Sequence, residues 1–295
     1  MKFGIGILPS PDINQTLSQV KIAEINGFEY AWIFDKYDGN IFNTIRNCII
    51  ETESIRIGPG VTNPYLNSPQ KIANEMSNIW NLSPDRTMLG IGPGDKDKLS
   101  QKNIEWKQPY NTLEKAINII KSEFNQNNKI PIYLEAQSQK LLKLSRKKSD
   151  GVLINSSYPK YYEKIIRNNP DLEINAFTTT SINNDSQIAK NAARIIVTFI
   201  IAGSSPQFLE EHNVPKLLSG KIYTNLCAGN VGGSISLVNN SLIDKFSITG
   251  TSYEVISKIE EMEKMGVSQF IAGPPIGKNI EESIRLFGEV ISTFG

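Results

Sequence analysis

The sequence predicts an α/β fold, namely a (β/α)8 TIM barrel with an insertion before the eighth strand. Two observations support this prediction. Short apolar runs with β-strand character alternate with longer stretches at helical spacing, a pattern typical of a parallel sheet. Eight such units fit within 295 residues, a length that suits one closed barrel better than an open doubly wound sheet. We therefore expect a single domain over residues 1–295, with residues 204–249 as an inserted helical and loop segment.

The first five units follow one another closely. A helical pattern with Val20 and Ile22 follows the first strand, and Gly27 is its expected stop. The third strand precedes a helix over 68–80, and Asn111 is the expected N-cap of the helix before the fifth strand. The eight expected strands are 2–8, 29–34, 55–61, 87–92, 130–136, 150–155, 173–179 and 269–273.

The pattern changes after the seventh strand. Residues 188–201 form a long apolar run at helical spacing, and the segment up to residue 249 is broken by glycine and proline. Helical spacing returns over 252–266, before the last strand and a final helix. This change of pattern places the insertion before the eighth strand.

Composition excludes several classes of protein. The chain has 31 basic and 30 acidic residues, so nothing in its charge favours nucleic acid or an anionic membrane as a partner. Cys48 and Cys227 are too few for a disulfide framework, and they favour a reducing, cytoplasmic location. The one histidine, His212, leaves no His-based metal site or Ser-His triad, so we expect no metal. Pro9 follows the first apolar run too soon for a signal peptide.

Two glycine-rich stretches end the third and fourth expected strands. They read Gly58-Pro59-Gly60 and Gly92-Pro93-Gly94, and in a TIM barrel both would lie at the C-terminal strand ends, where active sites form. Glycine permits close approach of the backbone to a ligand, but tight turns alone also explain these residues. Neither stretch has the spacing of a Rossmann fingerprint.

Five segments carry a family resemblance. "IGPGVTNPYLNSP", "LGIGPGDK", "IPIYLEAQ", "SDGVLINSSYP" and the C-terminal block that ends in "AGPPIG" resemble the luciferase-like, deazaflavin-dependent oxidoreductases, in particular the methylenetetrahydromethanopterin reductases. The resemblance runs in register over essentially the whole chain. It implies a cytoplasmic archaeal enzyme of one-carbon metabolism that transfers hydride between reduced coenzyme F-420, an 8-hydroxy-5-deazaflavin, and a pterin carrier. Two alternatives remain open: an FMN-dependent relative, such as a luciferase-like monooxygenase, or a member that has lost catalysis.

The resemblance also implies roles for individual residues. A non-proline cis peptide is implied at Gly60–Val61, against the back of the deazaflavin. Asp95 occupies the position of a catalytic acid, as proton donor or substrate anchor, and Asp35 would orient cofactor or substrate unless it only caps the next helix. The cofactor-binding residues expected at the strand ends are Gly60, Val61, Asn63, Gly92, Gly94, Ala136, Gln137, Ser138, Asn155 and Ser156. Asn63 also suits a turn before proline, and Asn155 and Ser156 also suit a cap of the following helix.

The chain departs from the family pattern at three positions. Gly6 stands where the reductases usually carry a glutamate, and Lys36 stands where a histidine often follows aspartate. Glu135 replaces a glycine at the phosphate end of the cofactor, where a carboxylate is unfavourable unless it is protonated or paired. We expect Glu135 to reshape this end of the pocket. The resemblance further implies a small-molecule pterin substrate and a homo-oligomer, either dimer or tetramer.

Overall fold

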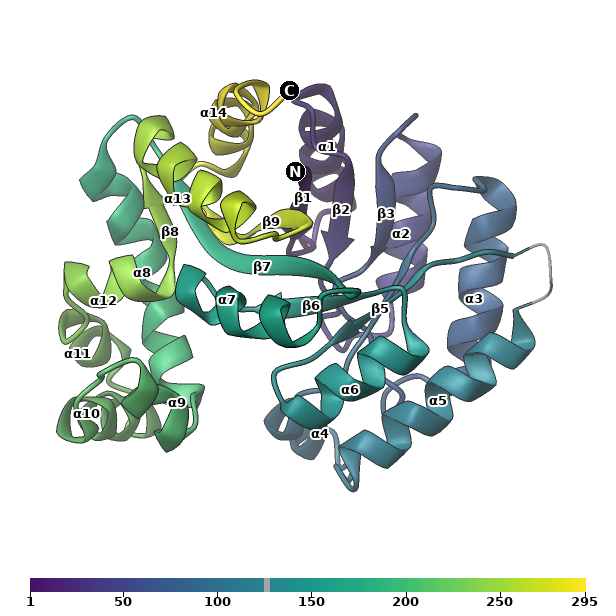
Figure 1. Cartoon of the computed structure of the whole chain (residues 1–295), viewed down its shortest axis with the longest axis horizontal. Helices are drawn as coiled ribbons and strands as arrows, with labels where there is room; N and C mark the ends of the chain where they lie inside the picture. The colour runs from purple at the N-terminus through teal and green to yellow at the C-terminus, as the bar shows by residue number, and fades with distance from the viewer. Residues whose placement is uncertain (125–127) are drawn as a thin grey trace.

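The computed structural model describes residues 1–124 and 128–295. Eight parallel strands form a nearly closed barrel in the order β3-β2-β1-β9-β7-β6-β5-β4, and a ninth, β8, pairs with the end of β7. Figure 1 shows the helices around this barrel, with α9–α12 gathered beyond α8. The strands are β1 (Lys2–Ile7), β2 (Tyr30–Ile33), β3 (Arg56–Pro59), β4 (Leu89–Ile91), β5 (Ile132–Glu135), β6 (Gly151–Asn155), β7 (Glu173–Ile182), β8 (Ile248–Gly250) and β9 (Gln269–Ile276).

The helices alternate with the strands as the sequence predicts, with extra ones in two places. A short helix, α4, follows β4 in a segment where the sequence predicted a loop, and four helices lie within residues 204–249. The helices are α1 (Ile13–Ile25), α2 (Ile41–Ile50), α3 (Pro69–Leu82), α4 (Lys96–Gln101), α5 (Pro109–Glu123), α6 (Gln139–Lys148), α7 (Pro159–Asn168), α8 (Ser186–Gly203), α9 (Pro206–Glu211), α10 (Lys216–Cys227), α11 (Val231–Ser236), α12 (Asn240–Phe246), α13 (Ser252–Lys264) and α14 (Ile280–Ser292).

The start of α5 corrects one prediction. Asn111 lies inside this helix and is not its N-cap, because the helix begins at Pro109 with Gln108 as the capping residue. Proline has no backbone N–H to satisfy and its fixed φ suits the first helical position, so Pro109 sets the helix start three residues earlier than an Asn111 cap would. Gln108 adopts φ 46°, which turns the chain into the helix.

Glycine closes the barrel between β3 and β4. These strands share only the bridges Ile57–Thr87 and Thr62–Ile91. A Cβ atom placed on Gly58 would lie 2.1 Å from the Met88 carbonyl oxygen, and one on Gly90 would lie 2.1 Å from the Pro59 carbonyl oxygen. The two backbones therefore approach so closely that neither position accepts a side chain. The glycine-rich stretches thus have a structural task in closing the barrel, in addition to any contact with a ligand.

Two apolar cores lie on opposite sides of the barrel wall. Side chains that point outward, such as Ile5 and Ile33, pack against the helices in the larger core. Inside the barrel, Trp32 and Tyr133 meet edge to face at 5.3 Å, with Met88 and Ile271 beside them. This filled interior makes the barrel a packed core whose chemistry must lie at its ends.

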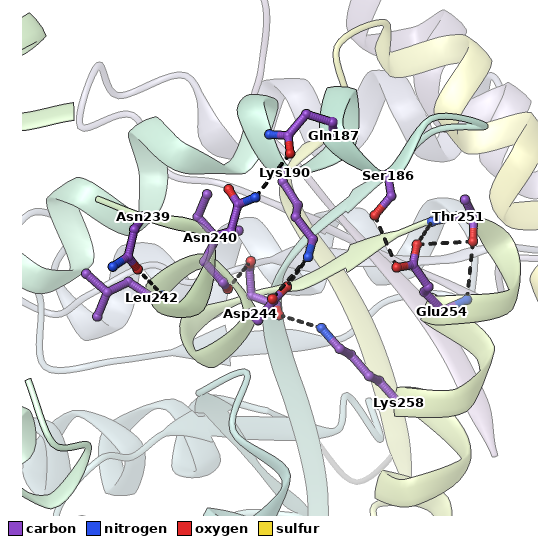
Figure 2. A network of polar contacts seen from close by, with 12 residues as sticks. Ser186, Gln187, Lys190, Asn239, Asn240, Leu242, Asp244, Thr251, Glu254 and Lys258 are labelled. Carbon is purple, nitrogen blue, oxygen red and sulfur yellow. Dashed lines mark hydrogen bonds and ion pairs between the residues drawn. The ribbon is translucent and has the colours of Figure 1, made fainter. Parts of the chain in front are cut away.

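The helices of residues 204–249 have a core of their own and a polar attachment to the barrel. Val197 and Ile201 of α8 pack against Ile222 and Ile243 in this separate core. Figure 2 shows the attachment, in which Lys190 of α8 pairs with Asp244 of α12 at 2.8 Å. In the same view, Ser186 Oγ donates to Glu254 Oε1 at 3.1 Å, and Glu254 completes the capping box at the start of α13. These contacts fix α8 and α12 relative to α13.

The two ends of the chain meet on the outside of the barrel. The rings of Phe3 and Phe294 lie 5.3 Å apart, and the marks for both termini lie close together in Figure 1. Within the described ranges no helix has the length and apolar character needed to cross a membrane.

Candidate functional site

The C-terminal ends of the strands bring most predicted site residues to one end of the barrel. Because the strands run parallel, residues that follow β2, β3, β4, β5 and β6 all emerge on the same face. Contacts across this mouth are direct. A Cβ atom on Gly92 would lie 2.4 Å from Glu135 Oε2 and 2.8 Å from Val61 Cγ2. Likewise, a Cβ atom placed on Gly94 would lie 3.2 Å from Asn63 Cγ.

The peptide bond between Gly60 and Val61 is cis, which confirms the sequence prediction. Gly60 N–H donates to the Ile33 carbonyl at 2.7 Å, and Thr62 N–H, two residues further along, donates to the Gly90 carbonyl at 3.1 Å. Val61 packs against the side chains inside the barrel. The segment after β3 is therefore fixed on both sides, to β2 and to β4.

Asp35 is a buried acceptor that holds this segment. Its Oδ1 accepts the Tyr37 N–H at 2.9 Å, and its Oδ2 accepts the hydroxyl of Thr62 at 3.1 Å. Burial outweighs these hydrogen bonds and raises the pKa of Asp35. The alternative that Asp35 caps the next helix is wrong, because Asn40 is the N-cap residue of α2. Asp35 instead joins the ends of β2 and β3.

Tyr37 links the segment after β2 to the segment after β4. It adopts φ 62°, and its hydroxyl oxygen accepts the Asp95 N–H at 2.9 Å. Burial raises the pKa of Tyr37 to about 12, and the neighbouring charges of Asp95, Asp35 and Glu135 add to the rise. The phenol therefore stays neutral at physiological pH. Three carboxyl groups lie close enough to act on the Tyr37 phenol.

Asp95 is exposed and begins α4 as its N-cap residue. Its Oδ1 accepts the N–H groups of Asp97 at 2.9 Å and Lys98 at 3.1 Å. These two bonds are the side-chain cap of the helix, and they leave Oδ2 outside the cap. Of the two roles expected for Asp95, that of a hydrogen-bond acceptor for substrate suits this geometry better than that of a proton donor.

Glu135 is the other carboxyl at the mouth, and its surroundings differ. It ends β5 pointing into the barrel and lies across Gly92. No hydrogen bond from the described residues reaches its carboxyl oxygens. Burial raises the pKa of Glu135, and the charge of Asp95 raises it further. The two carboxyl groups thus have opposite environments, since one is bound by N–H donors and the other is not.

The expected phosphate end lies where β5 and β6 lead into α6 and α7. Ala136 is buried, whereas Gln137 and Ser138 are exposed at the start of α6, and Ser138 Oγ caps that helix by accepting the Leu141 N–H at 3.3 Å. N–H groups in the first turn of a helix lack intrahelical partners and favour anions. These exposed residues therefore suit an anionic group of a ligand.

The residues that follow β6 do not cap the next helix directly. Asn155 is exposed at the end of the strand, and Ser156 is buried, where its Oγ accepts the Tyr158 N–H at 3.2 Å. The N-cap position of α7 belongs to Tyr158, which forms no side-chain cap, so the alternative that Asn155 or Ser156 caps α7 is wrong. Ser156 orders the turn before the helix, and Asn155 is left open at the mouth.

Asn63 makes a turn and keeps a free donor. Its Oδ1 accepts the N–H groups of Tyr65 at 3.1 Å and Leu66 at 2.9 Å, as the turn interpretation predicts. Its Nδ2 is buried and has no partner among the described residues. A buried donor of this kind calls for an acceptor, and Asn63 faces Gly94 at the mouth of the barrel.

Phe177 is a site residue that the sequence reasoning missed. Its ring lies over Gly6, and it meets Phe34 edge to face at 5.5 Å. The one available signal was alternation along β7, which turns Asn175, Phe177 and Thr179 to the same face of the strand. Tyr37 and Thr62 were also missed, and their only signal was proximity in sequence to Asp35 and Asn63.

Two other features bear on the location of the site. Within residues 1–124 and 128–295, no group of three or more histidine, cysteine, aspartate or glutamate residues is placed to hold a metal.

A cavity of about 320 Å³ opens at the opposite end of the barrel, lined by Lys2, Tyr30, Arg56 and Tyr133 among others. Arg56 is already bound there to the Tyr30 hydroxyl at 2.7 Å and to the Asp85 carbonyl. The cluster of interacting acids lies at the C-terminal mouth.

The chain is similar to known proteins over essentially its full length. The sequence profile of the luciferase-like monooxygenase family matches residues 1–269. A 5,10-methylenetetrahydromethanopterin reductase of Archaeoglobus fulgidus is 36% identical, over 99% of this chain and 98% of the relative. One of Methanolobus tindarius is 33% identical, over 99% of each chain. A solved coenzyme F-420-dependent tetrahydromethanopterin reductase from Methanopyrus kandleri superposes with a TM-score of 0.92 at 31% identity, over 100% of this chain and 99% of the other.

Proposed function

The chain belongs to the luciferase-like monooxygenase family, and from that premise we propose that it is a coenzyme F-420-dependent 5,10-methylenetetrahydromethanopterin reductase or a close paralogue. The observation that carries the proposal is similarity over the full length. Relatives of this name at 32–36% identity span almost the whole chain, and the solved Methanopyrus kandleri reductase superposes on all of it. An FMN-dependent enzyme is the minor alternative.

The residues at the mouth fit a deazaflavin. Exposed Gln137 and Ser138 at the start of α6, with Asn155 beside them, suit an anionic cofactor tail. The unpartnered Nδ2 of Asn63 and the backbone of Gly92 and Gly94 suit the ring system, because a buried donor needs an acceptor and glycine permits close approach. When bound, reduced deazaflavin supplies the hydride.

The protein's own residues orient and support this chemistry. We propose that Asp35 is a positioning residue that accepts hydrogen bonds from the Tyr37 N–H and from the Thr62 hydroxyl, and so holds the segment of Gly60 and Val61. Asp95 keeps one carboxylate oxygen free of the cap and is proposed as the anchor for N–H groups of the pterin. Ala136 and Ser156 shape the wall of the phosphate end. Orientation of two bound reactants is the main contribution that this reaction needs from the protein.

The oligomeric state and the location in the cell are also proposals. We propose a homo-oligomer, dimer or tetramer, as the family resemblance implies, and a cytoplasmic location, which the low number of cysteines favours. Light scattering of the purified protein measures the oligomer directly, and a monomer at working concentration would contradict this part.

Cofactor titration tests the proposed function. We expect reduced and oxidised coenzyme F-420 to bind in a fluorescence titration, and FMN in a parallel titration to bind far more weakly. Turnover is then followed by absorbance with methylenetetrahydromethanopterin and reduced cofactor. Binding of FMN alone would favour the alternative, and binding of neither would mean that the chain has left the family's chemistry.

A further inference from the structure

We propose that Glu135 is held as a neutral carboxylic acid and donates a hydrogen bond to an acceptor atom of the ring system bound at the barrel mouth. This inference rests on the proposed function for the identity of the ligand. It assigns a ligand-binding role to a side chain that stands where the resemblance implies glycine.

The first observation is the position of Glu135 at the mouth of the barrel. Glu135 lies at the end of β5 and faces inward, with Oε2 occupying the space in front of Gly92. A Cβ atom on Gly92 would also meet Val61 Cγ2, so the carboxyl lies beside the segment of the cis peptide. Val61, Gly92 and Glu135 therefore share one small volume at the centre of the mouth, and a ring bound there would contact the carboxyl.

The second observation is that the Glu135 carboxyl group has no partner among the described residues. Within the described residues, no N–H or O–H group donates to Glu135 and no cation pairs with it. Glu135 is half-buried, and withdrawing a carboxylate from water without donors or a counter-charge is costly, whereas a neutral acid needs only one acceptor. A ring carbonyl or ring nitrogen of a deazaflavin or pterin supplies such an acceptor. The ligand thus satisfies a group that the protein leaves open.

The third observation concerns the charged groups around Glu135. Asp95 faces Glu135 from the segment after β4, and Tyr37 and Asp35 face the mouth from the segment after β2. Two cations lie in this region: Lys98, whose Nζ lies over the Tyr37 ring at 5.4 Å, and Lys71, whose charge acts on Asp35. Burial and the Asp95 charge both raise the pKa of Glu135, which favours the proton that a donor requires. Asp95 already accepts two backbone N–H groups, whereas Glu135 has no such donor in the described part of the chain.

The test compares the pH dependence of cofactor affinity in three proteins. Wild type, Glu135→Gln and the control Glu289→Gln, which changes an exposed glutamate on the outer helix α14, are titrated with oxidised coenzyme F-420 from acid to alkaline pH. The ligand's own ionisation is common to all three, so only differences between the profiles are attributed to Glu135. In wild type and control, affinity is expected to fall by up to about tenfold per pH unit above the pKa of Glu135.

The glutamine variant distinguishes a donor from a repelling charge. Its amide still donates, so we expect its Kd to stay within about threefold of wild type at low pH and to lack the wild-type loss at high pH. If Glu135→Gln instead tightens binding equally at every pH, Glu135 is an ionised group that opposes the ligand, and the inference is overturned. Identical profiles for wild type and Glu135→Gln would overturn it as well.

An infrared measurement separates this inference from the proposed function. The C=O stretch of a protonated carboxyl is recorded for the free protein near neutral pH, as a difference between wild type and Glu135→Gln. A band that the substitution removes supports the neutral acid, and its absence contradicts it. Failure of the deazaflavin to bind any of the three proteins would overturn the proposed function and the donation to a ring, while the infrared band still decides the protonation state.

Discussion

The ring of Phe177 fills the space above Gly6 at the barrel mouth, since a Cβ atom on Gly6 would lie 2.7 Å from the Cε1 and Cζ atoms of the ring. Phe34 lies 3.0 Å from the same point. The first strand therefore has no room for the glutamate that the resemblance implies at this position. An aromatic group replaces the acid there, and the acid nearest the centre of the mouth is Glu135 on β5.

Gly6→Ala is expected to destabilise the protein by about 1–3 kcal/mol, because the methyl group overpacks against Phe177. Phe177→Ala in the same chain should relieve most of the clash, so the two changes will not be additive. Urea unfolding measures both singles and the double variant. The control is Gly232→Ala, where no atom lies within 4 Å of the new methyl group. Additive losses would show that the cost of the Gly6 methyl group does not arise from the Phe177 ring.

Gly58→Ala is expected to cost at least about 3 kcal/mol, because the new methyl group would meet the backbone carbonyl of Met88 at 2.1 Å. A backbone atom cannot turn away as a side chain does, so β3 and β4 must separate. Thermal unfolding and soluble yield report the loss. A stability close to that of the wild type would mean that the barrel does not need this close approach.

Gly92→Ala should displace the carboxyl of Glu135 and press on Val61, and so weaken deazaflavin binding about tenfold or more through the misplaced ring contact. Gly92→Ala combined with Glu135→Gly removes one of the two clashes and should recover part of the affinity. The titration is the one described for the cofactor. Equal affinities for Gly92→Ala and wild type would place the ring away from β4.

Glu135→Gln is expected to stabilise the free protein at neutral pH and to have little effect below pH 4, since 4.5 is the ordinary pKa of this group. The sign follows from burial, which raises the pKa in the folded protein. Above its ordinary value the unfolded chain releases the proton while the folded protein keeps it, so folding loses free energy until the folded pKa is reached. Denaturant unfolding at several pH values measures this. A stabilisation by Glu135→Gln that grows toward acid pH would contradict a raised pKa of Glu135.

Glu24→Gln is expected to destabilise the protein by about 1 kcal/mol at neutral pH. Glu24 Oε1 accepts the N–H groups of Ser54 at 2.6 Å and Ile55 at 2.9 Å, which tie α1 to the turn before β3. Burial alone would raise the pKa of Glu24, but these bonds outweigh it and lower the pKa. The stability is therefore present above the ordinary pKa of 4.5 and lost as pH falls through the lower folded value. Solvent screening at this partly exposed site keeps the effect small. An effect that persists in acid would contradict the charge-based account.

The order and type of the elements were largely readable from the sequence. Runs such as residues 2–7 and 151–155 are buried on both faces of a parallel strand, so they stand out as short apolar stretches between amphipathic helices. β8 and α4 were not predicted, because elements of three and six residues carry too little periodicity. The start of α5 was misplaced because a good capping residue, Asn111, competed with Pro109.

The sequence by itself determined the barrel, the end of the barrel that carries the polar strand ends, and the cis bond at Gly60–Val61, because these depend on local pattern and on resemblance along the chain. Only the tertiary structure decided which contacts and which role each side chain at that end has. Gly6 is paired with Phe177, 171 positions away by their numbering, and Glu135 with Gly92, and no local pattern encodes such contacts. The state of each carboxyl depends on burial and on N–H donors, which exist only once strands distant in sequence lie side by side. Folding thus makes Asp95 an acceptor and leaves Glu135 without a partner.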